Sequence, residues 1–174
     1  MKISVFIATS LDGFIARIDG GLDWLPPNGG EPHGYDEFMA SVDAVVIGRK
    51  TFETVLTYEV WPYEKKRVVV LSNQLREVKV PPGAMCEVMA GPLMKVVNKL
   101  ASDGVEHIYV DGGVTIRGFL EANLIQHLTI TRVPVLLGGG VPLFGHLAGD
   151  IRLEHVKTQA YPSGLVTSEY LVLP

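Results

Sequence analysis

Two segments of the sequence each join a short apolar run to glycine and then to a helical pattern. Residues 44–47 (AVVI) lead into Gly48-Arg49-Lys50-Thr51, and residues 107–110 (HIYV) lead into Asp111-Gly112-Gly113-Val114-Thr115. Glycine between the end of a strand and the start of a helix leaves backbone N–H groups open to an anion, at the positive end of the helix dipole. The first of these segments also supplies two cations, Arg49 and Lys50, and the hydroxyl group of Thr51. Together the two segments predict a phosphate-binding edge of a sheet.

Neither segment has the spacing of a dinucleotide-binding G-x-G-x-x-G motif or of a Walker A loop, so neither of those folds is expected. A third apolar run, residues 67–71 (RVVVL), ends in Ser72-Asn73-Gln74. Ser and Asn at the end of a strand usually begin a turn. Here they could also hydrogen-bond an adenosine ribose or its 2′-phosphate.

Carboxylates gather in a long irregular stretch, residues 9–34, and just after it. Asp12 lies beside a glycine, where it either bonds its own loop backbone or takes part in catalysis. Asp23 and Trp24 form a second pair, in which the indole is a lid or pocket wall and the carboxylate caps a turn or contacts substrate. Asp36 begins a helical pattern; it either complements the helix dipole or faces the substrate as an acid whose pKa is raised by desolvation.

The remaining polar candidates give weaker indications. Asp111 either steers a substrate or caps the helix that follows the glycine pair. The five histidines show no ligand spacing, so no metal site is predicted. The single cysteine, Cys86, has no base nearby in the sequence, and a nucleophilic role is not expected.

Apolar periodicity predicts the elements that position these residues. Apolar runs predict strands, and i, i+3, i+4 spacing predicts helices, in an alternating order that ends in strands only. Pro134 interrupts the sixth strand, so an edge or a bulge is expected there. The expected strands are 2–8, 44–47, 67–71, 85–89, 107–110, 127–137, 151–160 and 165–173, and the expected helices lie around 35–42, 52–56, 93–100 and 116–120.

This order predicts an α/β fold with a mostly parallel central sheet and an antiparallel hairpin at its C-terminal edge. The length of 174 residues suits a single domain, residues 1–174. A net charge of −4 and the lack of a basic cluster argue against a nucleic-acid partner. No apolar stretch approaches the length of a membrane span. The lone cysteine agrees with a cytoplasmic location.

Six motifs in order carry a family resemblance over nearly the whole chain: SVFIATSLDGFIA, GLDWLP, VVIGRKTFE, VVVLSN, IYVDGG and VPVLLGGGVPLF. The sequence resembles the dihydrofolate reductase superfamily. Within it, the sequence is most similar to the reductase domain of the bifunctional riboflavin-pathway deaminase-reductase. The zinc signature of the deaminase domain is absent from the chain.

The resemblance implies a three-layer dihydrofolate-reductase-like fold, NADPH, and hydride transfer to a small pterin- or ribosylaminopyrimidine-like heterocycle. It also implies a Gly-Gly turn, usually with a cis peptide. The exposed sheet edge and the apolar segment VPVLLGGGVPLF predict a homodimer, which relatives often form. Its cofactor-binding residues would be Ala8, Ile15, Gly48, Arg49, Lys50, Thr51, Leu71, Ser72, Asn73, Gly112, Gly113, Val114, Thr115 and Ile116, its substrate-binding residues Asp23, Trp24 and Phe38, and its catalytic candidates Asp36 and Asp12.

The match departs at the carboxylate that dihydrofolate reductases place four residues before the counterpart of Phe38, where this chain has Gly34. Glu31, Asp36 and Glu37 are the nearby alternatives, and we expect Asp36 to face the substrate. Two other functions therefore stay open. One is reduction of dihydrofolate or of a xenobiotic, and the other is a non-catalytic, dimeric nucleotide-binding module.

Overall fold

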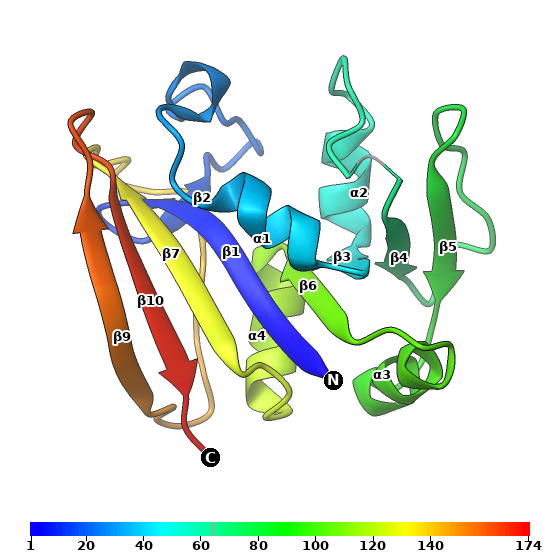
Figure 1. The fold of residues 1–174 in the computed structure, drawn as a ribbon. Helices are drawn as coiled ribbons and strands as arrows, with labels where there is room; N and C mark the ends of the chain where they lie inside the picture. The colour runs from blue at the N-terminus through cyan, green and yellow to red at the C-terminus, as the bar shows by residue number, and fades with distance from the viewer. Residues whose placement is uncertain (64) are drawn as a thin grey trace.

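The computed structural model describes residues 1–63 and 65–174, with only the backbone considered at Asn28. Figure 1 shows one twisted sheet with helices on both of its faces. The eight strands of this sheet are β1 (Lys2–Ser10), β3 (Ala44–Gly48), β4 (Arg67–Leu71), β5 (Met85–Met89), β6 (His107–Asp111), β7 (His127–Val133), β9 (Leu153–Ala160) and β10 (Val166–Val172). The helices are α1 (Tyr35–Ser41), α2 (Arg49–Val55), α3 (Leu93–Ser102) and α4 (Gly113–Glu121).

The strand order is β5-β4-β3-β6-β1-β7-β10-β9. The first six strands in this order pair in parallel, and β10 pairs antiparallel with both β7 and β9. The prediction of a mostly parallel sheet with an antiparallel C-terminal hairpin is confirmed. Because β1, β3 and β6 are central neighbours, their carboxyl ends meet at one edge, where ligands bind in open α/β sheets.

Alternation along the strands divides the core into two apolar layers. Val45 and Ile47 face the layer that contains α1 and α2, whereas Ala44 and Val46 face the layer that contains α3 and α4. All four residues are fully buried, as expected for parallel strands covered on both faces. Tyr109 of β6 belongs to the α1/α2 layer, and this parity decides which way the end of β6 points.

The predicted strand over residues 127–137 is too long, because β7 ends at Val133, directly before Pro134. The strand is also not an edge, since it pairs with β1 on one side and β10 on the other. Proline has no N–H to donate to a neighbouring strand, so a strand bonded on both sides ends where proline begins.

A second, two-stranded sheet was not predicted. It pairs β2 (Phe14–Ala16) with β8 (Val141–Pro142) in antiparallel orientation, and Leu143 N–H donates to Gly13 O. The long stretch after β1 is therefore attached to the segment after β7, and a short 3-10 helix, η1 (Pro27–Gly29), follows within it.

A buried histidine fixes helix α1 at the amino-terminal edge of the sheet, opposite the edge where the strands end. The ring of His107 lies 2.9 Å from Ser4 Oγ through Nε2 and 2.9 Å from Ser41 O through Nδ1. Asp43 Oδ2 accepts the N–H groups of Glu106 and His107. These bonds tie the end of α1 to β1 and β6, and so set where the beginning of α1 lies.

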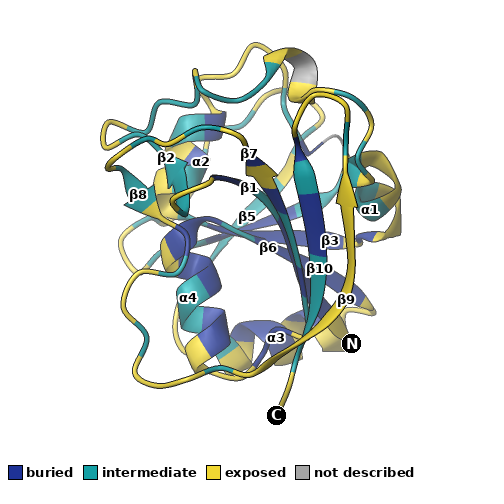
Figure 2. Cartoon of the chain, turned by 90° about the vertical axis from the view of Figure 1, so that its left-hand side faces the viewer, coloured by how far each residue is buried: buried dark blue, intermediate teal, exposed yellow. Residues whose placement is uncertain are grey.

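Strand β9 is the exposed edge of the sheet. All eight of its residues are exposed, including Leu153 and Val156, and Figure 2 shows it as a continuous exposed ribbon beside β10. The homodimer expected from the sequence stays a prediction, and this open edge is a surface that could serve it. None of the helices in the described part of the chain is both long and apolar enough to cross a membrane.

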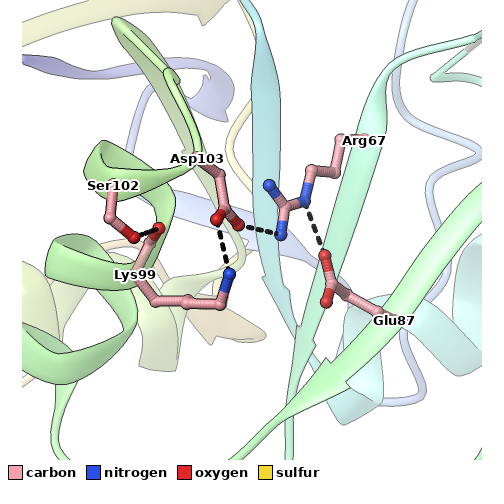
Figure 3. Close-up of polar contacts among 5 residues, drawn as sticks. All are labelled: Arg67, Glu87, Lys99, Ser102 and Asp103. Atoms are coloured by element: carbon pink, nitrogen blue, oxygen red, sulfur yellow. Dashed lines mark hydrogen bonds and ion pairs between the residues drawn. The ribbon is translucent and has the colours of Figure 1, made fainter.

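A network of four charges closes the amino-terminal edge at β4, β5 and α3. Arg67 donates to Glu87 Oε1 at 2.6 Å and to Asp103 Oδ2 at 2.8 Å, and Lys99 also pairs with Asp103 (Figure 3). The Lys99 ammonium and then the Arg67 guanidinium hold the pKa of the Asp103 carboxyl below its usual range. Because Arg67 serves two partners, one side chain orders both ion pairs.

We expect Arg67→Met to lower the melting temperature at pH 7 by roughly 2–4 °C. An isolated surface ion pair contributes little to stability, but an arginine shared by two carboxylates contributes more. The contribution of Asp103 is present above its unfolded-state pKa and is lost as the pH falls through its lowered folded-state pKa. The difference between wild type and variant should therefore shrink in acid. Arg76→Met, at an exposed arginine without an ion pair among the described residues, is the matched control; equal melting temperatures for both variants would contradict the network.

Candidate active site

The two glycine turns predicted to bind phosphate pack directly against each other. β3 and β6 are neighbours, with Ile47 opposite Asp111. A Cβ at Gly48 would lie 2.8 Å from Thr115 Oγ1, and a Cβ at Gly112 would overlap Thr51 Oγ1. In each turn, glycine leaves the space that the threonine hydroxyl of the other turn occupies. As a result, α2 and α4 begin side by side at the carboxyl edge of the sheet.

The beginning of α4 faces the β2–β8 sheet. A Cβ at Gly113 would lie 2.9 Å from Pro142 O and 3.2 Å from Ile15 Cδ1. Ile15 is thus placed beside the glycine pair. The first N–H groups of α4 have no acceptor within the helix, and its first turn contains no acidic residue. Val114 is exposed beside them, whereas Ile116 is fully buried in the core.

The turn after β6 is made by Gly112, which has φ 94° and ψ 131°. Side chains other than that of glycine rarely adopt this conformation. The cis peptide that the resemblance implies is not present, since the described residues contain no cis peptide bond. The positive φ of Gly112 turns the chain instead.

The two cations after β3 have different surroundings. Arg49 donates to Glu53 Oε1 and to Gln74 Oε1, each at 2.6 Å, and so holds the segment after β4 against α2. Lys50 is exposed and has no ion-pair partner among the described residues. Arg49 therefore orders the candidate phosphate site, while Lys50 is the cation left to reach a ligand.

The residues after β4 use their side chains within the turn. Ser72 Oγ accepts the N–H groups of Gln74 and Leu75, and Asn73 Oδ1 accepts the N–H of Gly91. Leu71 packs against the α3/α4 layer of the core. The structure thus brings the segment 71–74 to α2 through Arg49, with its polar side chains occupied in shaping the turn.

On the α1/α2 side of the same edge, the carboxyl group of Asp111 meets two tyrosines. Tyr63 Oη donates to Asp111 Oδ2 at 3.2 Å, and Asp111 Oδ1 accepts the N–H of Gly112 at 2.7 Å. The hydroxyl of Tyr109 donates to Phe6 O at 3.0 Å and also lies near the Asp111 carboxyl. Asp111 therefore lies between the glycine turn and the α1/α2 layer.

Burial raises the pKa of the Asp111 carboxyl, and the N–H of Gly112 and the nearby hydroxyls of Tyr63 and Tyr109 oppose this effect without reversing it. Burial and the neighbouring Asp111 charge raise the pKa of Tyr63 and Tyr109 far above the usual value, so both remain protonated donors. A carboxyl group with a raised pKa at the ligand-binding edge of a sheet is a candidate acid.

Aromatic rings line the path from β1 to Asp111. Phe38 of α1 lies 5.1 Å from Phe6 and 5.1 Å from Tyr109, measured between ring centroids. Tyr35 lies 5.4 Å from Phe6. Ala8 continues β1 on the same side as Phe6 and is partly buried. The predicted substrate residue Phe38 thus belongs to an apolar wall that ends at the acid.

The predicted loop residues have partners of their own. Both Asp12 oxygens accept backbone N–H groups, from Leu137 at 3.1 Å and Gly138 at 2.8 Å. Asp23 forms a two-point ion pair with Arg17 at 2.6 and 3.0 Å. Asp12 therefore joins the start of the loop to the segment after β7. Trp24 is partly buried, and its Nε1 has no hydrogen-bond partner in the described structure.

Asp36 lies in the first turn of α1 and is exposed. The apolar surroundings expected for it are found around Asp111 instead, and a catalytic role for Asp36 stays a prediction. Gly34 precedes α1 with φ 92°. Among the described residues, no group of three or more His, Cys, Asp or Glu side chains could hold a metal ion.

The sequence left two roles open for Asp111, steering a substrate or capping the next helix, and it gave no role to Tyr63 or Tyr109. A signal for Tyr109 existed, since residues two apart in a strand share a face and place it beside Asp111. Tyr63 gave no such signal, because it reaches Asp111 from a loop 48 positions earlier in the chain.

Residues 1–167 match the family described as the RibD C-terminal domain, and the chain belongs to this family. A solved structure of a proposed riboflavin biosynthesis protein from Shewanella sp. PV-4 is 40% identical, superposes with a TM-score of 0.90, and each chain covers 100% of the other. The family and this relative support a riboflavin-biosynthesis-like reductase, an oxidoreductase by class.

Two more distant structures agree with the fold. A diaminohydroxyphosphoribosylaminopyrimidine deaminase/5-amino-6-(5-phosphoribosylamino)uracil reductase from Thermotoga maritima has 14% identity and a TM-score of 0.77, over 99% of this chain and 56% of that one. A dihydrofolate reductase from Enterococcus faecalis, complexed with NADP(H) and RAB-propyl, has 18% identity and a TM-score of 0.70, over 99% of this chain and 97% of that one. The predicted dihydrofolate-reductase-like fold is confirmed.

Substituting Gly112 tests the contact between the two turns. We expect Gly112→Ala to lower the free energy of unfolding by about 1–3 kcal/mol without any ligand, because alanine disfavours the observed φ and its methyl group would meet Thr51. Urea unfolding of the cofactor-free protein measures this change. Gly149→Ala is the control, since a Cβ there meets nothing within 4 Å. Unchanged stability of Gly112→Ala would show that the turn is not held as described.

Proposed function

We propose that the protein is an NADPH-dependent reductase that transfers hydride to a pterin- or aminopyrimidine-like heterocycle. The observation that carries this proposal is the position of Asp111. Its carboxyl group stands at the end of β6, with the glycine turns on one side and the wall of Phe6, Tyr35, Phe38 and Tyr109 on the other. An acid beside a nucleotide-binding edge and a flat apolar wall suits reduction of a ring C=N bond.

The chain offers the groups that such a cofactor needs. The free N–H groups at the beginning of α4 suit a pyrophosphate, and no acidic residue in the first turn opposes it. Lys50 is available for a 2′-phosphate, with Arg49 holding the segment 71–74 nearby. Ile15, next to Gly113, offers an apolar contact for the nicotinamide. When bound, NADPH supplies the hydride.

The residues around Asp111 then control the proton. Reduction of C=N consumes one hydride at carbon and one proton at nitrogen, so an acid must be within reach of the ring. Protonated Asp111 gives its proton to that nitrogen and is reprotonated from water. Tyr63 and the N–H of Gly112 hold the carboxyl group in place and stabilise the carboxylate that is formed. The aromatic wall orients the ring and limits water.

Asp111→Asn tests this assignment. We expect kcat/KM for the heterocycle to fall at least about 100-fold, because asparagine keeps the shape but donates no acidic proton. In the wild type, kcat/KM should fall as the pH rises through the raised pKa of Asp111, and the variant should lose this dependence. The measurement is NADPH oxidation across a pH series, with NADPH binding to each protein measured by fluorescence.

Two comparisons make the result decisive. Glu121→Gln, at an exposed residue at the far end of α4, should leave rate and pH profile unchanged. Asp36→Asn tests the acid expected from the sequence. If Asp36→Asn loses the pH dependence and Asp111→Asn keeps it, the proton comes from Asp36. Unaltered NADPH binding in Asp111→Asn separates a lost acid from a damaged turn.

Cofactor choice provides a separate test. We expect Lys50→Ala to weaken NADPH binding roughly tenfold while leaving NADH binding unchanged, since a charge-assisted hydrogen bond contributes about 1.5–3 kcal/mol. Arg49→Ala should weaken both cofactors, because Arg49 orders the turn through Gln74. Titration of each protein with both nucleotides measures these effects. A wild type that binds NADH as tightly as NADPH would overturn the assignment of Lys50.

A further inference from the structure

His33 extends the aromatic wall at the end away from Asp111. Its ring centroid lies 5.8 Å from that of Phe6, the ring that Phe38 also contacts. Phe38 in turn lies 5.1 Å from Tyr109, whose hydroxyl group lies near the Asp111 carboxyl. The reduction proposed above gives this imidazole no role, although it is a titratable group beside the surface on which the acceptor would lie.

A hydrogen bond to the backbone assigns the two ring nitrogens of His33. Its Nδ1 lies 3.0 Å from Glu31 O. A carbonyl oxygen can only accept, so Nδ1 carries the hydrogen, and in the neutral ring Nε2 is an acceptor. Nε2 has no hydrogen-bond partner among the described residues, and it is not one of the unpartnered atoms that the protein buries. The half-buried ring therefore presents an accessible acceptor nitrogen.

The segment that carries His33 is held on both sides. Glu31 Oε1 accepts the N–H of Ser163, in the turn between β9 and β10, at 3.0 Å. A Cβ at Gly30 would lie 3.0 Å from Leu165 Cδ1, so the backbone packs directly on a buried leucine there. On the other side of His33, α1 begins two residues later. His33 is thus placed by β10 and α1, as is required of a residue that positions a ligand.

Two further polar atoms of the same segment, residues 24–33, have no hydrogen-bond partner in the described structure. They are Trp24 Nε1 and Glu31 Oε2, and both atoms are buried. Ser163 has the largest part in lowering the pKa of the Glu31 carboxyl, and His33 lowers it further, so the imidazole lies close to this carboxylate. Native proteins leave few buried polar atoms unpaired. Two of them on one short segment need an explanation, which a polar ligand beside His33 provides.

We propose that His33 is a specificity-determining residue, whose Nε2 accepts a hydrogen bond from an amino group of the acceptor heterocycle. The acceptor ring then lies on the wall between two polar groups, with its reducible C=N bond at Asp111 and its amino group at His33. This inference rests on the proposed function and narrows its substrate class to rings that carry an amino group at the end opposite the reduced bond. A carbonyl oxygen in that position would bring two acceptors together and is disfavoured.

Pterin and lumazine are a matched pair of probes, because pterin has an amino group where lumazine has a carbonyl oxygen. Their fluorescence reports binding to the protein saturated with NADP⁺ and does not depend on turnover. At pH 7 we expect the wild type to bind pterin at least about tenfold more tightly than lumazine. The preference should disappear as the pH is lowered to about 5, because a protonated imidazole donates at Nε2. The Glu31 carboxyl, the other titratable group beside the ring, has a lowered pKa and stays ionised over this range.

Three variants assign the preference to the imidazole. His33→Phe keeps a ring beside Phe6 but lacks Nε2, and should reduce the preference to less than about threefold and remove its pH dependence. His33→Gln can accept through Oε1 and should retain most of the preference. His146→Gln, at an exposed histidine between β8 and β9, should leave it unchanged. In turnover of 7,8-dihydropterin, His33→Phe should raise KM and leave kcat within about twofold, since the amino group is bound equally before and during reduction.

The outcomes separate this contact from the reductase function. Equal binding of the two probes by the wild type, or a preference that persists in His33→Phe or in acid, would overturn the inference and leave the reductase function to stand on NADPH oxidation. Loss of the preference in His33→Phe, without oxidation of NADPH by 7,8-dihydropterin, would support the contact and overturn the proposed function. Failure of both probes to bind would overturn both. The pH series uses the wild type alone, so the test holds even if a variant fails to fold.

Discussion

The contact between the turns after β3 and β6 is the constraint on which the rest of the site depends. Gly48 lies against Thr115, and Gly112 lies against Thr51. Neither turn leaves room for a side chain at its glycine, so the two neighbouring strands end together and their helices begin together. This packing brings Lys50 and the N–H groups of α4 to one edge although they lie more than 60 positions apart in the sequence.

Strand parity then assigns different tasks to the two sides of that edge. Val110 faces the α3/α4 layer, and Tyr109 faces the α1/α2 layer. Asp111 shares the face of Tyr109, so its carboxyl group points away from α4 and toward the aromatic wall. The residue after it, Gly112, begins the turn into α4. One residue step thus separates the Asp111 carboxyl group from the N–H groups at the beginning of α4.

Most of the fold could be predicted from the sequence, because buried parallel strands appear as continuous apolar runs and the helices between them have clear periodicity. The ends of elements were harder. β7 stops at Pro134 because it is bonded on both sides, and its pairing cannot be read from its own residues. The β2–β8 pair was missed because each strand is too short to show a periodic pattern of its own.

Only part of the candidate site could be predicted, because some of its features have a local sequence signature and others do not. Glycine turns at strand ends have a local signature, so Gly48, Gly112 and their neighbours could be named in advance. The acid could not be chosen, because the pKa of a carboxyl group depends on what buries it. Asp36 and Asp111 are equally polar in the sequence, yet one is exposed in a first turn and the other is surrounded by Tyr63 and Tyr109.

The beginning of α4 adds a second influence on the Asp111 carboxyl. Asp111 Oδ1 accepts the N–H of Gly112, the residue directly before α4, so the carboxyl group lies at the positive end of that helix. A negative charge is stabilised at such a position. Burial acts in the opposite direction, because it disfavours the charged form. The pKa of Asp111 is raised because burial has the larger effect, so this carboxyl group differs from an exposed one such as that of Asp36 through its surroundings alone.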